Sequence, residues 1–114
     1  MILDKPNTRK IKILGTEWTV FVEHKTEDSY ADAWCDNSVK EIHLVIWKDD
    51  DSLADLVEAG KTYVRHEIIH AFLHESGLAQ NSSGCNCWAQ NEEMVDWIAV
   101  QFHKIEKVFK ELKI

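Results

Sequence analysis

The chain has 114 residues, 45% of them hydrophobic, and a formal net charge of −7 at pH 7. This length and hydrophobic fraction are enough for one compact domain with a single core. Nucleic acid is an unexpected partner, because its phosphates are bound through clustered Lys and Arg and this chain is acidic overall. No apolar run reaches the ~18 residues that span a bilayer and the N-terminus lacks the apolar stretch of a secretory signal, so we expect a cytoplasmic protein without a membrane anchor.

The first half of the chain alternates apolar and polar residues with the period of two that is typical of β-strands. Residues 1–9, which contain Pro6, are expected to form a flexible arm ahead of these strands. Two hairpins are predicted, each formed by two alternating segments around a turn-forming dipeptide: 11–13 and 18–22 about Gly15-Thr16, and 30–35 and 41–47 about Asp36-Asn37.

The second half has the period of a helix. Apolar residues recur three and four apart over residues 53–72, and Gly77 supplies a stop. Gly60 interrupts this pattern, so the segment is either one long helix or a short helix abutting a longer one. Residues 78–87 predict a loop, and the helical period resumes over residues 88–112. The chain therefore predicts an α+β domain in which a small, mainly antiparallel sheet packs on two long helices.

Within the first helical segment, residues 66–70 spell H-E-I-I-H. Side chains four apart lie on one face of a helix, so His66 and His70 can bring two imidazoles to one metal ion. Glu67 projects at a neighbouring angle, from which it can reach a metal-bound water without being a ligand, and we expect it to act as a general base. The spacing indicates zinc, which can lower the pKa of a bound water to about 7.

A catalytic zinc site normally takes three protein ligands, so a third must come from elsewhere. His74 lies eight residues from His66, about 12 Å along the helix, which is too far for the same ion. His103 could be the third ligand only if the last helix directed its side chain toward His66 and His70. All three cysteines are expected to be reduced thiols, and the soft thiolates of Cys85 and Cys87 would indicate a structural site.

Glu92 is the stronger candidate for the third ligand. Glu92 and Asp96 are four apart in the segment N-E-E-M-V-D, so one carboxylate can bind the metal while the other accepts the free N–H of a ligating histidine. The adjacent Glu93 remains an alternative ligand. Two antiparallel helices joined by the 78–87 loop would bring these residues together, and the small side chain of Ala99 would allow their close approach.

These two motifs, H-E-I-I-H followed by N-E-E-M-V-D, resemble the gluzincin class of zinc peptidases, in which H-E-x-x-H precedes N-E-x-x-x-D. The resemblance covers roughly residues 30–100, and it extends to minimal gluzincins and to phage- and mobile-element-encoded peptidases. It implies a zincin-like fold with one zinc ion and the following roles: His66, His70 and Glu92 as ligands, Glu67 as general base, and Asp96 as the carboxylate behind a ligand.

By the same resemblance, we expect hydrolysis of a peptide or protein substrate, with strand 41–47 lining the cleft and pairing with the extended substrate. The histidine or tyrosine that stabilises the oxyanion in this class has no clear counterpart, and three residues are candidates by type alone: Tyr63, His74 and His103. The alternative is a non-catalytic zinc-binding or regulatory protein-interaction module. Glu67 favours the enzyme, since a structural site has no use for a carboxylate beside the first ligand.

Overall fold

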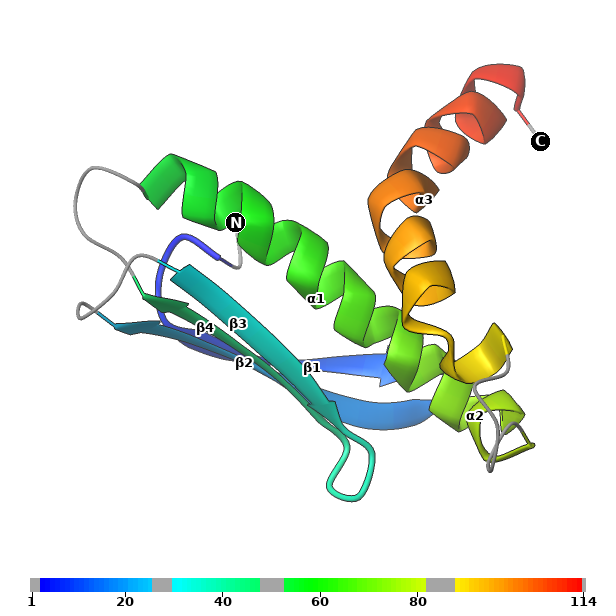
Figure 1. The fold of residues 1–114 in the computed structure, drawn as a ribbon, viewed down its shortest axis with the longest axis horizontal. Coiled ribbons are helices and arrows are strands. Elements are labelled where there is room, and N and C mark those ends of the chain that lie inside the picture. Colours follow the sequence, from blue (N-terminus) through cyan, green and yellow to red (C-terminus); the bar gives the residue numbers. More distant parts are fainter. Residues whose placement is uncertain (1–2, 26–29, 48–52, 82–87, 114) are drawn as a thin grey trace.

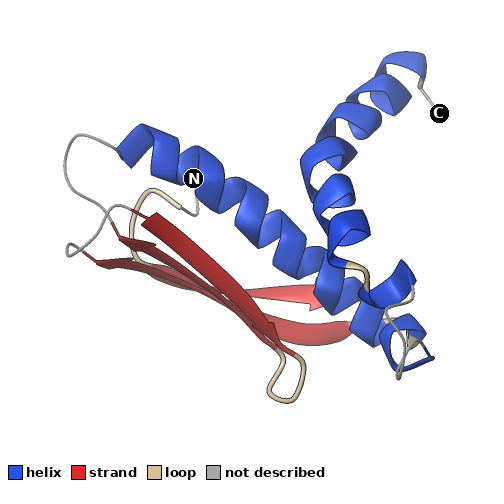
Figure 2. Ribbon diagram, viewed as in Figure 1, coloured by secondary structure: helices blue, strands red, loops and turns tan. Residues whose placement is uncertain are grey.

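The computed structural model describes residues 3–25, 30–47, 53–81 and 88–113. A four-stranded sheet packs against one long helix, and a second long helix leaves this layer at an angle (Figure 1). Figure 2 shows the helices gathered on one side of the sheet. The expected α+β class is confirmed. In chain order the elements are β1 (Asn7–Ile13), β2 (Thr16–Lys25), β3 (Tyr30–Asp36), β4 (Glu41–Trp47), α1 (Leu53–Glu75), α2 (Leu78–Asn81), the 3₁₀ turn η1 (Trp88–Gln90) and α3 (Glu92–Leu112).

Both predicted hairpin pairings are present, but the sheet that they form is mixed. β1 pairs with β2 and β3 pairs with β4 in antiparallel fashion, whereas β2 and β4 pair in parallel. The strand order is β1-β2-β4-β3, so β4 is an inner strand and β3 lies at an edge. The parallel pairing joins segments about twenty residues apart, such as Val20 with Ile42, and no local turn signal specifies it.

The first hairpin turns one residue earlier than its sequence suggests. Leu14 and Gly15 both have positive φ, 48° and 86°, while Ile13 and Thr16 are already paired. Positive φ at both central residues is the requirement of a two-residue type I′ turn, whose twist matches that of the strands. Gly15 adopts this conformation without strain, and Leu14 adopts it at a cost.

The core lies between the sheet and α1. Trp18 is fully buried, as are the inward-facing residues of β4. Gly60 lies inside α1, which is one continuous helix of 23 residues. A Cβ at Gly60 would stand 3.3 Å from Leu44 Cδ2, so the glycine lets α1 approach the sheet closely. Leu3 is also buried in this core, Asp4, Lys5 and Pro6 are exposed, and β1 begins at Asn7.

The C-terminal end of α1 is held to the sheet by Glu75. Its carboxylate accepts hydrogen bonds from Trp18 Nε1 at 2.8 Å and from Thr16 Oγ1 at 3.1 Å, and it forms an ion pair with Lys40 Nζ at 2.9 Å. The hydrogen bond from Lys40 is the largest cause that holds the pKa of Glu75 below its ordinary value. Gly77, with φ of 84°, follows the end of the helix, as its sequence position predicts.

α3 begins four residues later than expected, because Asn91 caps it. The Asn91 side chain accepts from the backbone N–H of Met94 at 2.9 Å, and the preceding residues form η1. Val95 and Ala99 are fully buried where α3 meets α1. The helices then diverge as an open V, so the expected antiparallel pair is wrong (Figure 1). Among the described helices, none combines the length and the apolar character needed to cross a membrane.

Candidate metal centre

Three potential metal ligands converge where α1 meets the start of α3. His66 Nε2 lies 3.0 Å from His70 Nε2 and 3.0 Å from Glu92 Oε2, and His70 Nε2 lies 3.3 Å from the same oxygen. All three ligand atoms fall within 4.8 Å of one another. The two histidines come from successive turns of α1, and Glu92 is the first residue of α3.

The spacing of these atoms suits a zinc ion. Zinc bonds of 2.0–2.2 Å in a tetrahedral site place ligand atoms roughly 3.3–3.6 Å apart, close to the separations found here. Two imidazole nitrogens and a carboxylate are a common ligand set of catalytic zinc. Both histidine side chains are mostly buried, whereas Glu92 is exposed at the mouth of the site. The centre is therefore open to solvent on one side, as a catalytic position requires.

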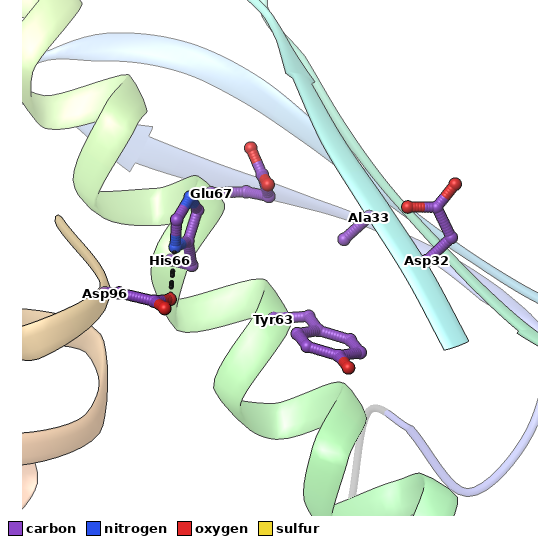
Figure 3. Close-up of a pocket in the computed structure, with 6 residues that line it drawn as sticks. All are labelled: Asp32, Ala33, Tyr63, His66, Glu67 and Asp96. Carbon is purple, nitrogen blue, oxygen red and sulfur yellow. Dashed lines mark hydrogen bonds and ion pairs between the residues drawn. The ribbon is translucent and has the colours of Figure 1, made fainter. Parts of the chain in front are cut away.

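Asp96 contacts the ring nitrogen of His66 that points away from His70 and Glu92. His66 Nδ1 lies 2.8 Å from Asp96 Oδ1, and Figure 3 shows this contact. Because an ionised carboxylate only accepts hydrogen bonds, Nδ1 would donate to Asp96, and Nε2, which lies 3.0 Å from Glu92 Oε2, is the ring nitrogen directed at the candidate centre. α3 thus supplies the candidate ligand Glu92 and, one turn later, the carboxylate that contacts a candidate ligand on α1.

The structure distinguishes between the two adjacent glutamates. Asn91 caps α3, which makes Glu92 the first helical residue and directs it toward α1. Glu93 is exposed and does not belong to the group of ligand atoms. The cap therefore sets the rotational phase of the helix, and with it which of the two glutamates faces His66 and His70.

Glu67 lies beside the ligands and extends toward β3 (Figure 3). Partial burial raises the pKa of its carboxyl group, while His66 and His70 act in the opposite direction. Within the described residues it has no hydrogen-bond or ion-pair partner. A half-buried, unpaired carboxylate is a stronger base than an exposed one, which fits proton transfer next to a metal.

Two adjoining cavities form a groove between α1 and β3, and both are lined by Ala33, His66 and Glu67. Their volumes are about 270 Å³ and 360 Å³. The edge strand β3 therefore forms one wall of the groove. The expectation that strand 41–47 lines the cleft is wrong, because β4 is paired on both sides and has no free edge. Apart from the three shared residues, the linings are Asp32, Tyr63 and Asp96 in the smaller cavity, and Trp34, Cys35, His70, His74 and Glu92 in the larger.

The three candidates for oxyanion stabilisation occupy different places. Tyr63 lines the smaller cavity and His74 lines the larger one, so they flank Glu67 along the groove. Burial lowers the pKa of His74, and its Nδ1 is buried without a partner among the described residues. His103 lies instead in an apolar cavity between α1 and α3, with Arg65 among its lining. The structure therefore does not bring His103 to the metal centre.

Cys35 faces the same groove as a free thiol. Burial is the main cause that raises its pKa to about 12, so it remains protonated at neutral pH and is a poor metal ligand. Cys85 and Cys87 lie outside the described residues. Sequence reasoning did not identify Ala33 and Cys35 as groove residues, although the alternation of β3 places both on its apolar face.

Comparisons with protein-family models, with curated proteins and with solved structures find no match to this chain.

Proposed function

We propose that the protein is a zinc-dependent metallopeptidase with a zincin-like fold of the gluzincin type. The observation that supports this proposal most strongly is the convergence of His66, His70 and Glu92 within hydrogen-bond distance of one another, with Asp96 behind His66. Glu67 adds an unpaired base at the same place. In the proposed enzyme, these five residues divide into three ligands, one orienting carboxylate and one general base.

The chemistry follows from these roles. Bound zinc would polarise the scissile carbonyl and lower the pKa of a water to about 7. Glu67 accepts a proton from the attacking water and then donates it to the leaving nitrogen, so that one amide and one water become a carboxylic acid and an amine. Asp96 keeps His66 in the tautomer that presents Nε2.

An extended peptide is the substrate that best fits the groove. β3 is an edge strand, and its backbone can pair with a peptide laid between it and α1. Glu67 stands midway along this path, between the cavity of Tyr63 and that of His74. Either of these two side chains can donate to the oxygen of the reacting carbonyl, and both are retained as candidates. The free thiol of Cys35 suits a reducing compartment, so we place the enzyme in the cytoplasm.

The alternative is a module that binds zinc, or a protein partner, without catalysis. The unpaired Glu67 favours the enzyme, because burying part of a carboxylate costs free energy and gains nothing in a structural site. Hydrolysis of a protein substrate by wild type and by Glu67→Gln separates the two. The enzyme requires cleavage by wild type, and zinc retained without cleavage in Glu67→Gln. Full zinc content in a wild type that cleaves no tested protein or peptide would favour the binding module.

A further inference from the structure

Three planar side chains stack in a row across one face of the sheet. His43 on β4 lies between Phe21 on β2, with ring centroids 4.7 Å apart and planes 11° apart, and Trp34 on β3, at 4.8 Å and 6°. The strand register produces this arrangement, because Phe21 is paired with His43 and His43 with Trp34. We call these three residues the ring row.

The ring row ends at Trp34, whose side chain is 44% exposed although His43 covers one face of the indole. β3 is an edge strand, so no described strand supplies a ring for the other face. Side chains alternate along a strand: Ala33 and Cys35 pack against the core, and Trp34 therefore lies on the outer face of the sheet. Figure 3 shows the same alternation, with Ala33 directed toward α1 and Asp32 to the other side of β3.

A peptide bound along β3 would continue the ring row. Paired residues on neighbouring strands lie on the same face with Cβ atoms about 4.5–5.5 Å apart. The ring row already has this spacing, at 4.7 Å and 4.8 Å. Trp34 also lines the larger cavity of the groove, together with Glu67 and His70. The peptide residue beside Trp34 would therefore place its side chain against the open face of the indole while the same peptide lies beside the candidate metal centre.

The charges beside Trp34 decide which planar group fits there. Its neighbours on the outer face of β3 are Asp32 and Asp36, two residues away in either direction. Asp32 is exposed, and no cation of the described residues forms an ion pair with it. Asp36 accepts hydrogen bonds from the hydroxyl and backbone N–H of Ser38, and the hydroxyl is the largest cause that lowers the pKa of its carboxyl group. Negative charge on both sides favours a planar cation over a neutral ring.

We propose, on the basis of the peptidase function above, that the groove selects a peptide with an arginine beside Trp34. The guanidinium group is planar, so it can stack parallel to the rings of the ring row while its N–H groups reach a carboxylate on either side. Lysine offers a point charge without a plane, and phenylalanine leaves both aspartates without a partner. The net charge of −7 also attracts a basic substrate.

NMR titration of the isotope-labelled full chain tests this recognition independently of cleavage. The probes are acetylated and amidated peptides of the form Thr-Val-X-Val-Thr, in which X is arginine, lysine, leucine, phenylalanine or glutamate. Glu67→Gln serves as the background, so that the probe stays intact. The indole N–H resonance of Trp34, identified by its loss in Trp34→Phe, should shift on titration. The arginine probe should bind about tenfold more tightly than the leucine probe.

Two variants separate the effect of the ring from that of the charges. Trp34→Ala should reduce the preference for arginine over leucine to less than about threefold, because only the ion pairs remain. Trp97→Ala is its matched control, since Trp97 is 59% exposed on α3 and lines neither cavity of the groove. Asp32→Lys should make the glutamate probe bind more tightly than the arginine probe. Glu111→Lys makes the same change of charge near the end of α3 and should preserve the preference for arginine.

Cleavage provides a second readout. Mass spectrometry of a peptide mixture digested by wild type with zinc should show arginine enriched at one position relative to the cut bond, and Trp34→Ala should lose this enrichment. Equal binding of the arginine and leucine probes, tightest binding of the phenylalanine probe, or a preference that survives Trp34→Ala would overturn the proposal. Cleavage without selection of arginine would contradict the specificity alone. Binding that selects arginine, in a wild type that cleaves nothing, would contradict the peptidase function alone.

Discussion

The Nδ1 atom of His66 donates a hydrogen bond to Oδ1 of Asp96 over 2.8 Å, across the junction of α1 and α3. This contact joins the two helices at the point where the proposed ligands meet. It leaves Nε2 as the ring nitrogen of His66 that faces His70 and Glu92.

Removing that carboxylate should weaken zinc binding without removing a ligand. We expect Asp96→Ala to lower zinc affinity by about 10- to 100-fold, because His66 loses the partner that sets its tautomer and orientation. Competition with a chelating dye measures the affinity. Glu93→Ala is the matched control, since Glu93 is an exposed carboxylate in the same turn of α3 and lies outside the ligand group. Equal zinc affinities of the two variants would show that Asp96 does not contribute to zinc binding.

Of the two groove residues that flank Glu67, His74 is expected to matter more for turnover. Its buried Nδ1 has no described partner, so a proton there would be unsatisfied and the accessible Nε2 is the better donor. Losing a donor to the reacting oxygen lowers kcat by about 10²- to 10³-fold. We expect this of His74→Phe with zinc retained and KM little changed, and only a small effect of Tyr63→Phe. The reverse ranking would assign the role to Tyr63.

The stability of the fold should depend on the ionisation of Glu75. Its pKa is lowered in the folded state by Lys40, Trp18 and Thr16, so the unfolded state binds its proton more readily. The contribution of Glu75 to the free energy of unfolding is therefore present at neutral pH. It is lost as the pH falls below about 4.5 and through the lowered pKa that Glu75 has in the folded state.

Thermal unfolding of wild type and Glu75→Gln at several pH values measures this effect. The variant should have a lower Tm at pH 7, and the difference should shrink in acid. Glu58→Gln provides a comparison, because Glu58 has a lowered pKa but forms its ion pair with Lys61 on the surface. A difference between wild type and Glu75→Gln that does not change with pH would contradict the assigned cause.

The close approach of α1 to the sheet at Gly60 predicts a further stability effect. A valine there would force its side chain against Leu44, and overpacking of this kind costs about 1–3 kcal/mol. Urea unfolding of Gly60→Val measures the loss. Glu58→Val, at an exposed position of the same helix, separates the helix propensity of valine from the steric effect. Similar losses in both variants would mean that the helix does not need a glycine at this point.

The parts of the structure that follow local rules could be predicted from the sequence. His66 and His70 share a face because they are four apart on a helix, and the alternation of β1 and β2 gives their hairpin. The Asn91 cap could also be predicted, since an asparagine three residues before Met94 is a typical signal for the start of a helix. The apolar period, which already begins at Trp88, hides this signal by predicting an earlier start of the helix.

The remaining features depend on contacts between distant segments. The parallel pairing of β2 with β4 places β3 at the edge, and so makes Ala33 a wall of the groove. The direction of α3 depends on the buried contact of Val95 and Ala99 with α1, after which the helices separate. The spacing of residues along the chain specifies neither the order of the strands nor the angle between the helices.

The metal content of the purified protein tests the central claim most directly. Measured by elemental analysis, wild type should hold one zinc ion per chain, His66→Ala and Glu92→Ala should lose it, and Glu93→Ala should retain it. Wild type without stoichiometric zinc would contradict the account. So would zinc that is lost in Glu93→Ala and kept in Glu92→Ala.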